Sequence, residues 1–235
     1  MNAGALKQTT YSFLLAIVCL VAVYVPTFLL VSLLIKSGSL GKVTPDELQI
    51  AAAPFIICIS AAIALGIMAV LARRRGQSLA TFGFKRPSLR HALMGLGLGV
   101  VCAYGLHALG SVLPIHATLD MGPMQRWQLI LYFWIGAPIQ EEVIFRGLIQ
   151  SVVETRHPDP LRLGKFPLPF SVLVSALLFA VVHIGTARLG ASLSQVLFIV
   201  SGAFVLGLLA GWLRWRSGSL APGILVHALF NMLAG

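Results

Sequence analysis

Charged residues are scarce in this chain. Asp, Glu, Lys and Arg make up only 10% of its 235 residues, whereas 58% are hydrophobic. Because about a quarter of the residues of a typical soluble domain are charged, this composition excludes an ordinary soluble protein. The mean hydropathy of +0.92 leads to the same conclusion. The sequence predicts an integral membrane protein.

Cysteine, internal repeats and hydrophilic stretches are equally sparse. The three cysteines, Cys19, Cys58 and Cys102, are isolated within apolar runs, and no CxxC spacing or other metal-ligand pattern links them. No internal repeat, low-complexity tract or hydrophilic domain interrupts the chain. We therefore expect residues 1–235 to form a single integral membrane domain.

Seven apolar stretches are long enough to cross a bilayer, which takes roughly 20 residues in a helix. Backbone groups in lipid must be hydrogen-bonded within their own segment, and strand-like alternation is absent from the sequence. The sequence thus predicts an all-α, polytopic transmembrane helical bundle of about seven spans, with eight as the alternative. The predicted spans cover residues 11–35, 47–72, 91–113, 127–153, 167–187, 192–213 and 220–235.

The 17 Lys and Arg residues divide unevenly between the two sides of this bundle. With the N-terminus in the cytoplasm, twelve fall on the inner side and four on the outer side, and Arg146 lies within a span. Cytoplasmic loops carry such an excess of basic residues. We therefore expect a multi-pass protein of a bacterial or archaeal cell membrane with a cytoplasmic N-terminus. The asymmetry also accounts for most of the net charge of +10, so no nucleic-acid partner is expected.

The most basic loop, RRRGQSLATFGFKRPSLRH, runs from Arg73 to His91. It could lie on anionic lipid headgroups, to which each basic residue near the surface contributes about 1 kcal/mol. The plainer interpretation is that the loop determines topology and does nothing more. The sequence leaves both interpretations open.

Six polar residues lie in stretches that otherwise suit lipid. An ionisable side chain near the middle of a bilayer costs at least about 2.5 to 3.5 kcal/mol, so such residues face a bundle interior or a wet cavity. Their positions therefore indicate a functional site. The six are Glu141, Glu142, Arg146, His183, His227 and Asn231.

Helical geometry divides the first of these groups, within IQEEVIFRG. Glu142 and Arg146 are four residues apart, so a helix places them on one face within reach of an ion pair. Glu141 is rotated by about 100° and lacks that partner. Pro138 has no N–H, leaves the carbonyl of Trp134 without its usual donor, and favours a kink or local widening of the helix. We expect a structural pair of Glu142 with Arg146, and a hydrated pocket beside Glu141.

His227 and Asn231 are also four residues apart, and both side chains can donate hydrogen bonds. Depths estimated from the helical rise are compatible with one cluster that includes Glu141 and His183. A carboxylate with a histidine can remove a proton from water, while a second histidine and an asparagine can donate to the oxyanion on an attacked carbonyl. The pattern favours amide hydrolysis without a serine or cysteine nucleophile.

These motifs resemble those of a known family. EEVIFR, FAVVH and HALFN, in this order on successive late helices, are similar to the EExxxR, FxxxH and HxxxN motifs of the CPBP family of intramembrane proteases, also called the Abi family or type II CAAX prenyl endopeptidases. The resemblance includes LATFGFKRPS and GSLAPGILVHALFN. It implies a CPBP-like catalytic core over residues 82–231 and the activity of an intramembrane glutamic endopeptidase.

The resemblance also implies a role for each site residue. Glu141 would be the general base and would work with His183 to activate the attacking water. His227 and Asn231 would stabilise the oxyanion. The residues that would shape the site or contact the substrate are Glu142, Arg146 and Phe179.

Two versions of this mechanism fit the residues. Glu141, His183 and His227 are side chains of the kinds that bind zinc, so a zinc-dependent protease is the alternative. The HExxH pairing of helical zinc proteases is absent from the sequence, and we therefore favour the metal-free mechanism with no cofactor.

The expected substrate is a membrane-embedded or lipidated peptide or protein. The competing function is a non-catalytic membrane scaffold or a bacteriocin-immunity-type protein, which would not need Glu141 or Asn231. A transporter would also place carboxylates and histidines in the bilayer, but internal repeats are absent. The chain ends four residues after Asn231, where relatives often continue into a further helix. That leaves room for a homo-oligomer or another partner that covers the last helix.

Overall fold

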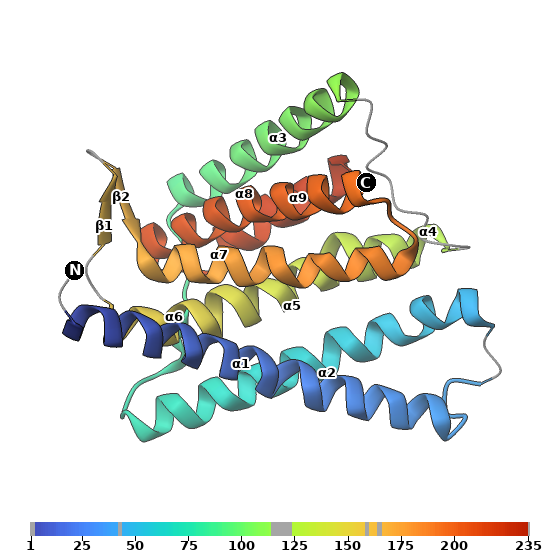
Figure 1. The fold of residues 1–235 in the computed structure, drawn as a ribbon, viewed down its shortest axis with the longest axis horizontal. Coiled ribbons are helices and arrows are strands. Elements are labelled where there is room, and N and C mark those ends of the chain that lie inside the picture. The colour runs from blue at the N-terminus through green and yellow to red at the C-terminus, as the bar shows by residue number, and fades with distance from the viewer. Residues whose placement is uncertain (1–2, 42–43, 114–123, 158–159, 164–165, 235) are drawn as a thin grey trace.

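Helices form at every stretch where the sequence predicts one, which confirms the helical membrane bundle. The structure is a computed structural model that describes residues 3–41, 44–113, 124–157, 160–163 and 166–234. The long helices lie side by side and connect at two opposite ends of the bundle (Figure 1). The longer helices are α1 (Ala3–Lys36), α2 (Pro45–Arg74), α3 (Leu89–Val112), α7 (Phe170–Val182), α8 (Leu193–Ser217) and α9 (Ala221–Ala234).

The helix that carries the Glu-Glu pair is one run, residues 126–154, in which the hydrogen-bond register changes. In its two π-helical parts, the N–H of one residue bonds to the carbonyl five residues earlier, as Ala137 does to Tyr132 and Gln150 to Phe145. The predicted widening of this helix is therefore confirmed. The parts are α4 (Arg126–Gln128), η2 (Leu129–Gly136), α5 (Ala137–Glu142), η3 (Val143–Ile149) and α6 (Gln150–Glu154).

A β-hairpin departs from the all-α prediction. The strands β1 (Pro160–Leu163) and β2 (Phe166–Pro169) pair antiparallel between α6 and α7. The predicted span 167–187 therefore begins too early, because α7 starts at Phe170, directly after β2. The same span ends in a short 3₁₀ helix, η4 (His183–Leu189). A second 3₁₀ helix, η1 (Leu79–Phe82), lies in the loop between α2 and α3.

Five described helical segments are long and apolar enough to cross a membrane, judged by length and composition. Helices also form at the other two predicted spans: the run of residues 126–154 carries polar residues, and α9 is shorter. These two helices hold Glu141, Glu142, Arg146 and His227. The protein is thus a multi-pass helical membrane protein. The five segments are Lys7–Lys36, Ile50–Arg74, Leu89–Val112, Phe170–Ala187 and Leu193–Ser217.

Local sequence signals set the helix ends. Ser192 and Gln195 form a reciprocal capping box at the start of α8, and Gly218 ends that helix with a φ of 65°, a conformation that favours glycine. Thr44 and Glu47 form the equivalent box at the start of α2. Hydrogen bonds from the backbone and hydroxyl of Thr44 lower the pKa of Glu47, which lies before the apolar part of that helix.

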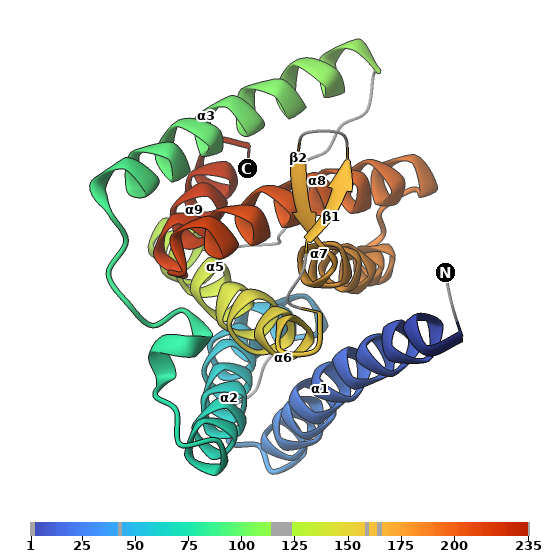
Figure 2. The same cartoon turned by 90° about the vertical axis from the view of Figure 1, so that its left-hand side faces the viewer.

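The helix of residues 126–154 occupies the middle of the bundle. Figure 2 shows α5 and α6 surrounded by α1, α2, α7 and α9. Residues 142–153 are all buried, and Glu141, directly before them, is partly buried. α3 lies farther out and packs along α9. A Cβ on Gly95 would lie 2.6 Å from the carbonyl oxygen of Pro222, and one on Gly99 would lie 2.9 Å from that of Val226. These glycines let α3 approach the helix that carries His227, as small residues do where membrane helices pack closely.

Candidate active site

Glu142 and Arg146 form a fully buried ion pair. Nη1 of Arg146 donates to Oε1 of Glu142 at 2.8 Å, and both side chains are 0% exposed. The guanidinium also lies over the ring of Phe179, 4.4 Å from its centroid. The ion pair predicted from the spacing of four residues is present. Because burying either charge alone costs several kcal/mol, the two residues depend on each other.

His227 joins the two neighbouring glutamates. Its Nδ1 lies 3.1 Å from Oε1 of Glu142, and its Nε2 lies 3.6 Å from Oε2 of Glu141. Since an ionised carboxylate can only accept hydrogen bonds, Nδ1 carries a proton, an assignment that follows from the partner atom. Nε2 then faces Glu141, so the imidazole is fixed on one side and available for proton exchange on the other.

The charges of this cluster do not balance without one more proton. With both glutamates ionised and His227 neutral, Arg146 offsets only one of two negative charges. One additional proton between Nε2 of His227 and Glu141 would make the cluster neutral. Glu141 is also the more accessible carboxylate, with 21% of its side chain exposed against 0% for Glu142. Of the two carboxylates, Glu141 is therefore the one that water or a substrate can reach.

Asn231 closes a gap that Pro138 opens in the backbone. In the π register of η2, the N–H of residue 138 would bond to the carbonyl of Phe133, but proline has no N–H. Nδ2 of Asn231 donates to that carbonyl at 3.0 Å. Asn231 thus reaches the carbonyl one residue before that of Trp134, because the prediction for Trp134 assumed an α register and Ala137 bonds in the π register. One hydrogen atom of the Asn231 amide remains for another acceptor.

The ring of Phe179 lies at the centre of the polar cluster. It makes edge contacts with the ring of His227, at a centroid distance of 5.5 Å, and with that of His183, at 4.7 Å. Nδ1 of His183 lies 2.8 Å from the carbonyl of Phe179, which can only accept, so Nδ1 is the protonated nitrogen. In the neutral imidazole, Nε2 of His183 is then the nitrogen that can accept a proton.

Glycines bring α8 and α9 close to these charges. A Cβ on Gly223 would lie 2.9 Å from Oε2 of Glu142, and one on Gly207 would lie 3.2 Å from Nη2 of Arg146. A Cβ on Gly211 would lie 3.1 Å from Oε1 of Gln150, whose Nε2 donates to the carbonyl of the same Gly211. Gly207 and Gly211 thus allow α8 to pack closely against the buried ion pair and Gln150.

Tyr24 on α1 is a site residue that the sequence does not reveal. Nε2 of Gln140 donates to its hydroxyl at 3.5 Å, and the phenol is close enough to Glu141 to interact electrostatically. Gln140 itself is 4% exposed. Tyr24 is an ordinary residue in an apolar span, more than a hundred positions from Glu141, so only the packing of α1 brings it to the site.

The structure thus brings together most of the predicted site. Glu141, Glu142, Arg146 and His227 form one contact cluster, and Phe179 links His183 to it. Among the described residues, no hydrogen bond or ion pair joins His183 directly to Glu141. Among the same residues, no three His, Cys, Asp or Glu side chains are arranged to hold one metal ion. The three residues of the zinc alternative therefore do not converge in this structure.

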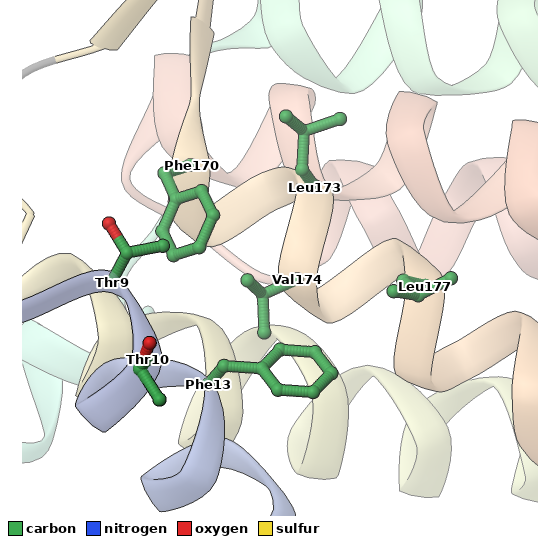
Figure 3. Close-up of a pocket in the computed structure, with 7 residues that line it drawn as sticks. All are labelled: Thr9, Thr10, Phe13, Phe170, Leu173, Val174 and Leu177. Carbon is green, nitrogen blue, oxygen red and sulfur yellow. The ribbon is translucent and has the colours of Figure 1, made fainter. Parts of the chain in front are cut away.

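A groove of about 350 Å³ opens elsewhere, between α1 and α7 (Figure 3). It contains no titratable side chain and none of the predicted site residues, so it cannot perform the expected chemistry. The site is therefore assigned from its hydrogen-bonded cluster and not from this groove. The groove is lined by Thr9, Thr10, Phe13, Phe170, Leu173, Val174 and Leu177.

The fold and the cluster define a helical membrane protein with two carboxylates and two histidines gathered inside the bundle. Residues 123–233 match the family described as "Type II CAAX prenyl endopeptidase Rce1-like", which confirms the resemblance to the CPBP family. The matched segment is similar to an Rce1-like domain, and it contains every predicted site residue. The match supports a CAAX-type protease at the level of the family.

A relative and the solved structures complete the comparison. The chain is 32% identical over 98 residues to a protein from Escherichia coli described as "Uncharacterized 24.3 kDa protein". The aligned part is 42% of this chain and 38% of that protein, so the chain matches well under half of its relative. No solved structure matches the chain significantly.

Proposed function

We propose that the protein is an intramembrane glutamic endopeptidase that hydrolyses a peptide bond of a membrane-associated protein or peptide. The observation that carries the proposal is the placement of His227 between Glu141 and Glu142, at 3.6 and 3.1 Å. The Rce1-like match of the same segment supports it. A purely structural ion pair needs Glu142 and Arg146 but gives no reason for Glu141 beside a histidine.

The reaction begins at Glu141. Its carboxylate takes a proton from a water molecule while the water oxygen forms a bond to the carbonyl carbon of the substrate. The electron pair of the carbonyl double bond moves to the oxygen, which becomes an oxyanion. Glu141 then gives the proton to the amide nitrogen as the carbon–nitrogen bond breaks, so that the base is restored at the end of each turnover.

His183 and His227 have different tasks in this scheme. Nε2 of His183, which can accept a proton, orients the attacking water together with Glu141. His227 is held through Nδ1 by Glu142 and donates from Nε2 to the oxyanion when it carries the extra proton of the cluster. The second amide hydrogen of Asn231 is the other donor. Glu142 and Arg146 position His227 and do not exchange protons with the substrate.

Tyr24 holds Glu141 in this arrangement. Its oxygen accepts from Gln140, so the phenolic hydrogen is available to donate toward the carboxylate of Glu141 through one water molecule. A donor at this place keeps the carboxylate directed at the water instead of at His227. Tyr24 is therefore a positioning residue contributed by α1, outside the segment that matches the family.

The proposed mechanism uses no metal, because Glu141 and His183 act on the water directly. We place the protein in the cytoplasmic membrane of a bacterial or archaeal cell. Its basic end, which includes the N-terminal part of α1 and the loop between α2 and α3 (Figure 1), faces the cytoplasm.

The test is cleavage of a library of membrane peptides by the purified protein, read by mass spectrometry with and without a chelator. Wild type is compared with Glu141→Gln and His183→Ala, and with Glu47→Gln as the matched control. Glu47 lies at the start of α2, and glutamine keeps an acceptor for its capping bond. We expect cleavage by wild type and Glu47→Gln, with or without chelator, and none by the two site variants.

Other outcomes would overturn the proposal. Equal cleavage by all four proteins would remove Glu141 and His183 from the mechanism. A wild-type protein that is folded and cleaves nothing would favour the scaffold or immunity function, in which the buried Glu142–Arg146 pair serves only to join helices. Loss of cleavage with chelator alone, restored by zinc, would establish the zinc-dependent version.

A further inference from the structure

The loop between α2 and α3, together with the helix ends on either side of it, presents a group of basic side chains that the proposed reaction does not use. We name these six residues the basic platform, and all six are exposed. No Asp or Glu occurs between residues 73 and 91. None of the six forms an ion pair with a carboxylate among the described residues. They are Arg73, Arg74, Arg75, Lys85, Arg86 and Arg90.

Apolar side chains are exposed among these cations. Leu89 is 75% exposed, Phe84 is 40% exposed and Leu79 is 36% exposed. The loop begins where the apolar segment Ile50–Arg74 ends and finishes where Leu89–Val112 begins. It therefore lies at the level where two spans leave the bilayer. Cations beside exposed leucine and phenylalanine at this level fit the boundary between headgroups and acyl chains.

The backbone of the platform is fixed to the rest of the protein. Phe82 is buried, and Gly83 adopts a φ of 96° against Leu220. The carbonyl of Gly83 accepts from the N–H of Leu220 at 3.0 Å, and that of Thr81 accepts from Nη2 of Arg214 at 3.1 Å. The carbonyl of Lys85 accepts from the hydroxyl of Ser219 at 2.5 Å. The backbone that carries the neighbouring cations is thus held in a set position.

We propose that the basic platform binds the headgroups of anionic phospholipids in the surrounding leaflet. Six unpaired cations attract negative charge, while Leu79, Phe84 and Leu89 select an amphiphile over a soluble anion. A topology determinant needs only the number of positive charges and would work equally well on a loose loop. The three hydrogen bonds that hold this loop against α8 and the start of α9 serve a surface with a defined arrangement.

The test titrates the purified full chain in neutral detergent micelles with phosphatidylglycerol or phosphatidylcholine and follows the melting temperature. A ligand that binds only the folded state raises the melting temperature as its concentration increases. We expect phosphatidylglycerol to raise it at a low mole fraction, and phosphatidylcholine or inorganic phosphate to have no such effect. Because micelles expose both ends of the bundle, the result does not depend on membrane orientation.

The matched variants each neutralise one lysine and one arginine. Lys85→Gln with Arg86→Gln removes two cations of the platform, whereas Lys36→Gln with Arg126→Gln removes two exposed cations elsewhere. Each basic residue near an anionic surface strengthens binding about fivefold. We therefore expect the platform variant to need about 25-fold more phosphatidylglycerol for the same rise in melting temperature. The variant at Lys36 and Arg126 should behave as wild type.

Either of two results would overturn the proposal. In the first, the platform variant has the same phosphatidylglycerol midpoint as wild type. In the second, the midpoint of the Lys36 and Arg126 variant shifts as far as that of the platform variant, which would show a response to net charge alone. If Lys85→Gln with Arg86→Gln lowers the melting temperature without lipid, Arg74→Gln with Arg75→Gln at the end of α2 gives the same comparison. These measurements require no peptidase activity and are independent of the proposed function.

Discussion

Nδ1 of His227 and Nη1 of Arg146 meet at the same carboxylate oxygen, Oε1 of Glu142, at 3.1 and 2.8 Å. Glu142 therefore connects a structural partner within its own helix to a catalytic candidate on α9. This gives the two adjacent glutamates different tasks. In the proposed mechanism, Glu142 holds the cluster together and Glu141 exchanges protons with the substrate.

The first prediction concerns stability. Glu142→Gln leaves the buried guanidinium of Arg146 without its counter-charge, and breaking a buried pair on one side costs about 3 to 5 kcal/mol. Glu141→Gln changes a partly exposed carboxylate and should cost much less. Thermal unfolding in the same detergent measures both. Equal destabilisation by the two substitutions would contradict the division of tasks.

The second prediction concerns Asn231 and Pro138. Asn231→Ala leaves the carbonyl of Phe133 without a donor, which costs about 1 to 3 kcal/mol. In a Pro138→Ala background, the new backbone N–H can donate to that carbonyl, so Asn231→Ala should then cost less. A double-mutant cycle on unfolding free energies measures the difference. Strictly additive effects would show that Asn231 does not replace the missing donor.

The third prediction concerns the close approach of α9. A Cβ at residue 223 would lie 2.9 Å from Oε2 of Glu142, so Gly223→Ala must displace α9 or the carboxylate. We expect lower stability and loss of peptide cleavage. Gly97→Ala is the matched control in α3, because no atom lies within 4 Å of its added Cβ. The interpretation fails if both variants unfold at the same temperature and cleave equally.

The fourth prediction concerns Tyr24. Tyr24→Phe removes the hydroxyl but keeps the ring, which stacks on Phe28 at a centroid distance of 5.9 Å. We expect kcat to fall by about tenfold or more, with KM and melting temperature little changed, since a hydrogen bond to a charged group is worth about 1.5 to 3 kcal/mol. Tyr104→Phe, on an exposed position of α3, should leave kcat unchanged. A wild-type kcat for Tyr24→Phe would remove α1 from the mechanism.

The sequence predicts the parts of this site that depend on a single helix. A spacing of four residues is enough to pair Glu142 with Arg146, and Pro138 is enough to predict a local widening. Spacing does not predict that His227 contacts both glutamates, because that depends on how closely α9 can approach. The approach follows from Gly223, whose importance becomes visible only when Glu142 lies opposite it.

The start of one predicted span is wrong. Residues 167–169 were predicted as part of a membrane span, since their apolar side chains resemble a helix start, but they belong to strand β2. The carbonyl that Asn231 reaches is that of Phe133, one residue before Trp134, because the prediction assumed an α register and Ala137 bonds in the π register. Tyr24 shows the same limit, as an isolated tyrosine in an apolar span has no local signal for a role at a distant carboxylate.

The most direct measurement is the turnover of one cleaved peptide by Glu141→Gln beside wild type and Glu47→Gln, with the folded fraction of each protein matched and a chelator present. A general base contributes about a hundredfold or more to the rate. We predict that Glu141→Gln loses at least that factor in kcat, while Glu47→Gln equals wild type. Turnover by Glu141→Gln at the wild-type rate would contradict the assignment of Glu141 as the residue that activates water.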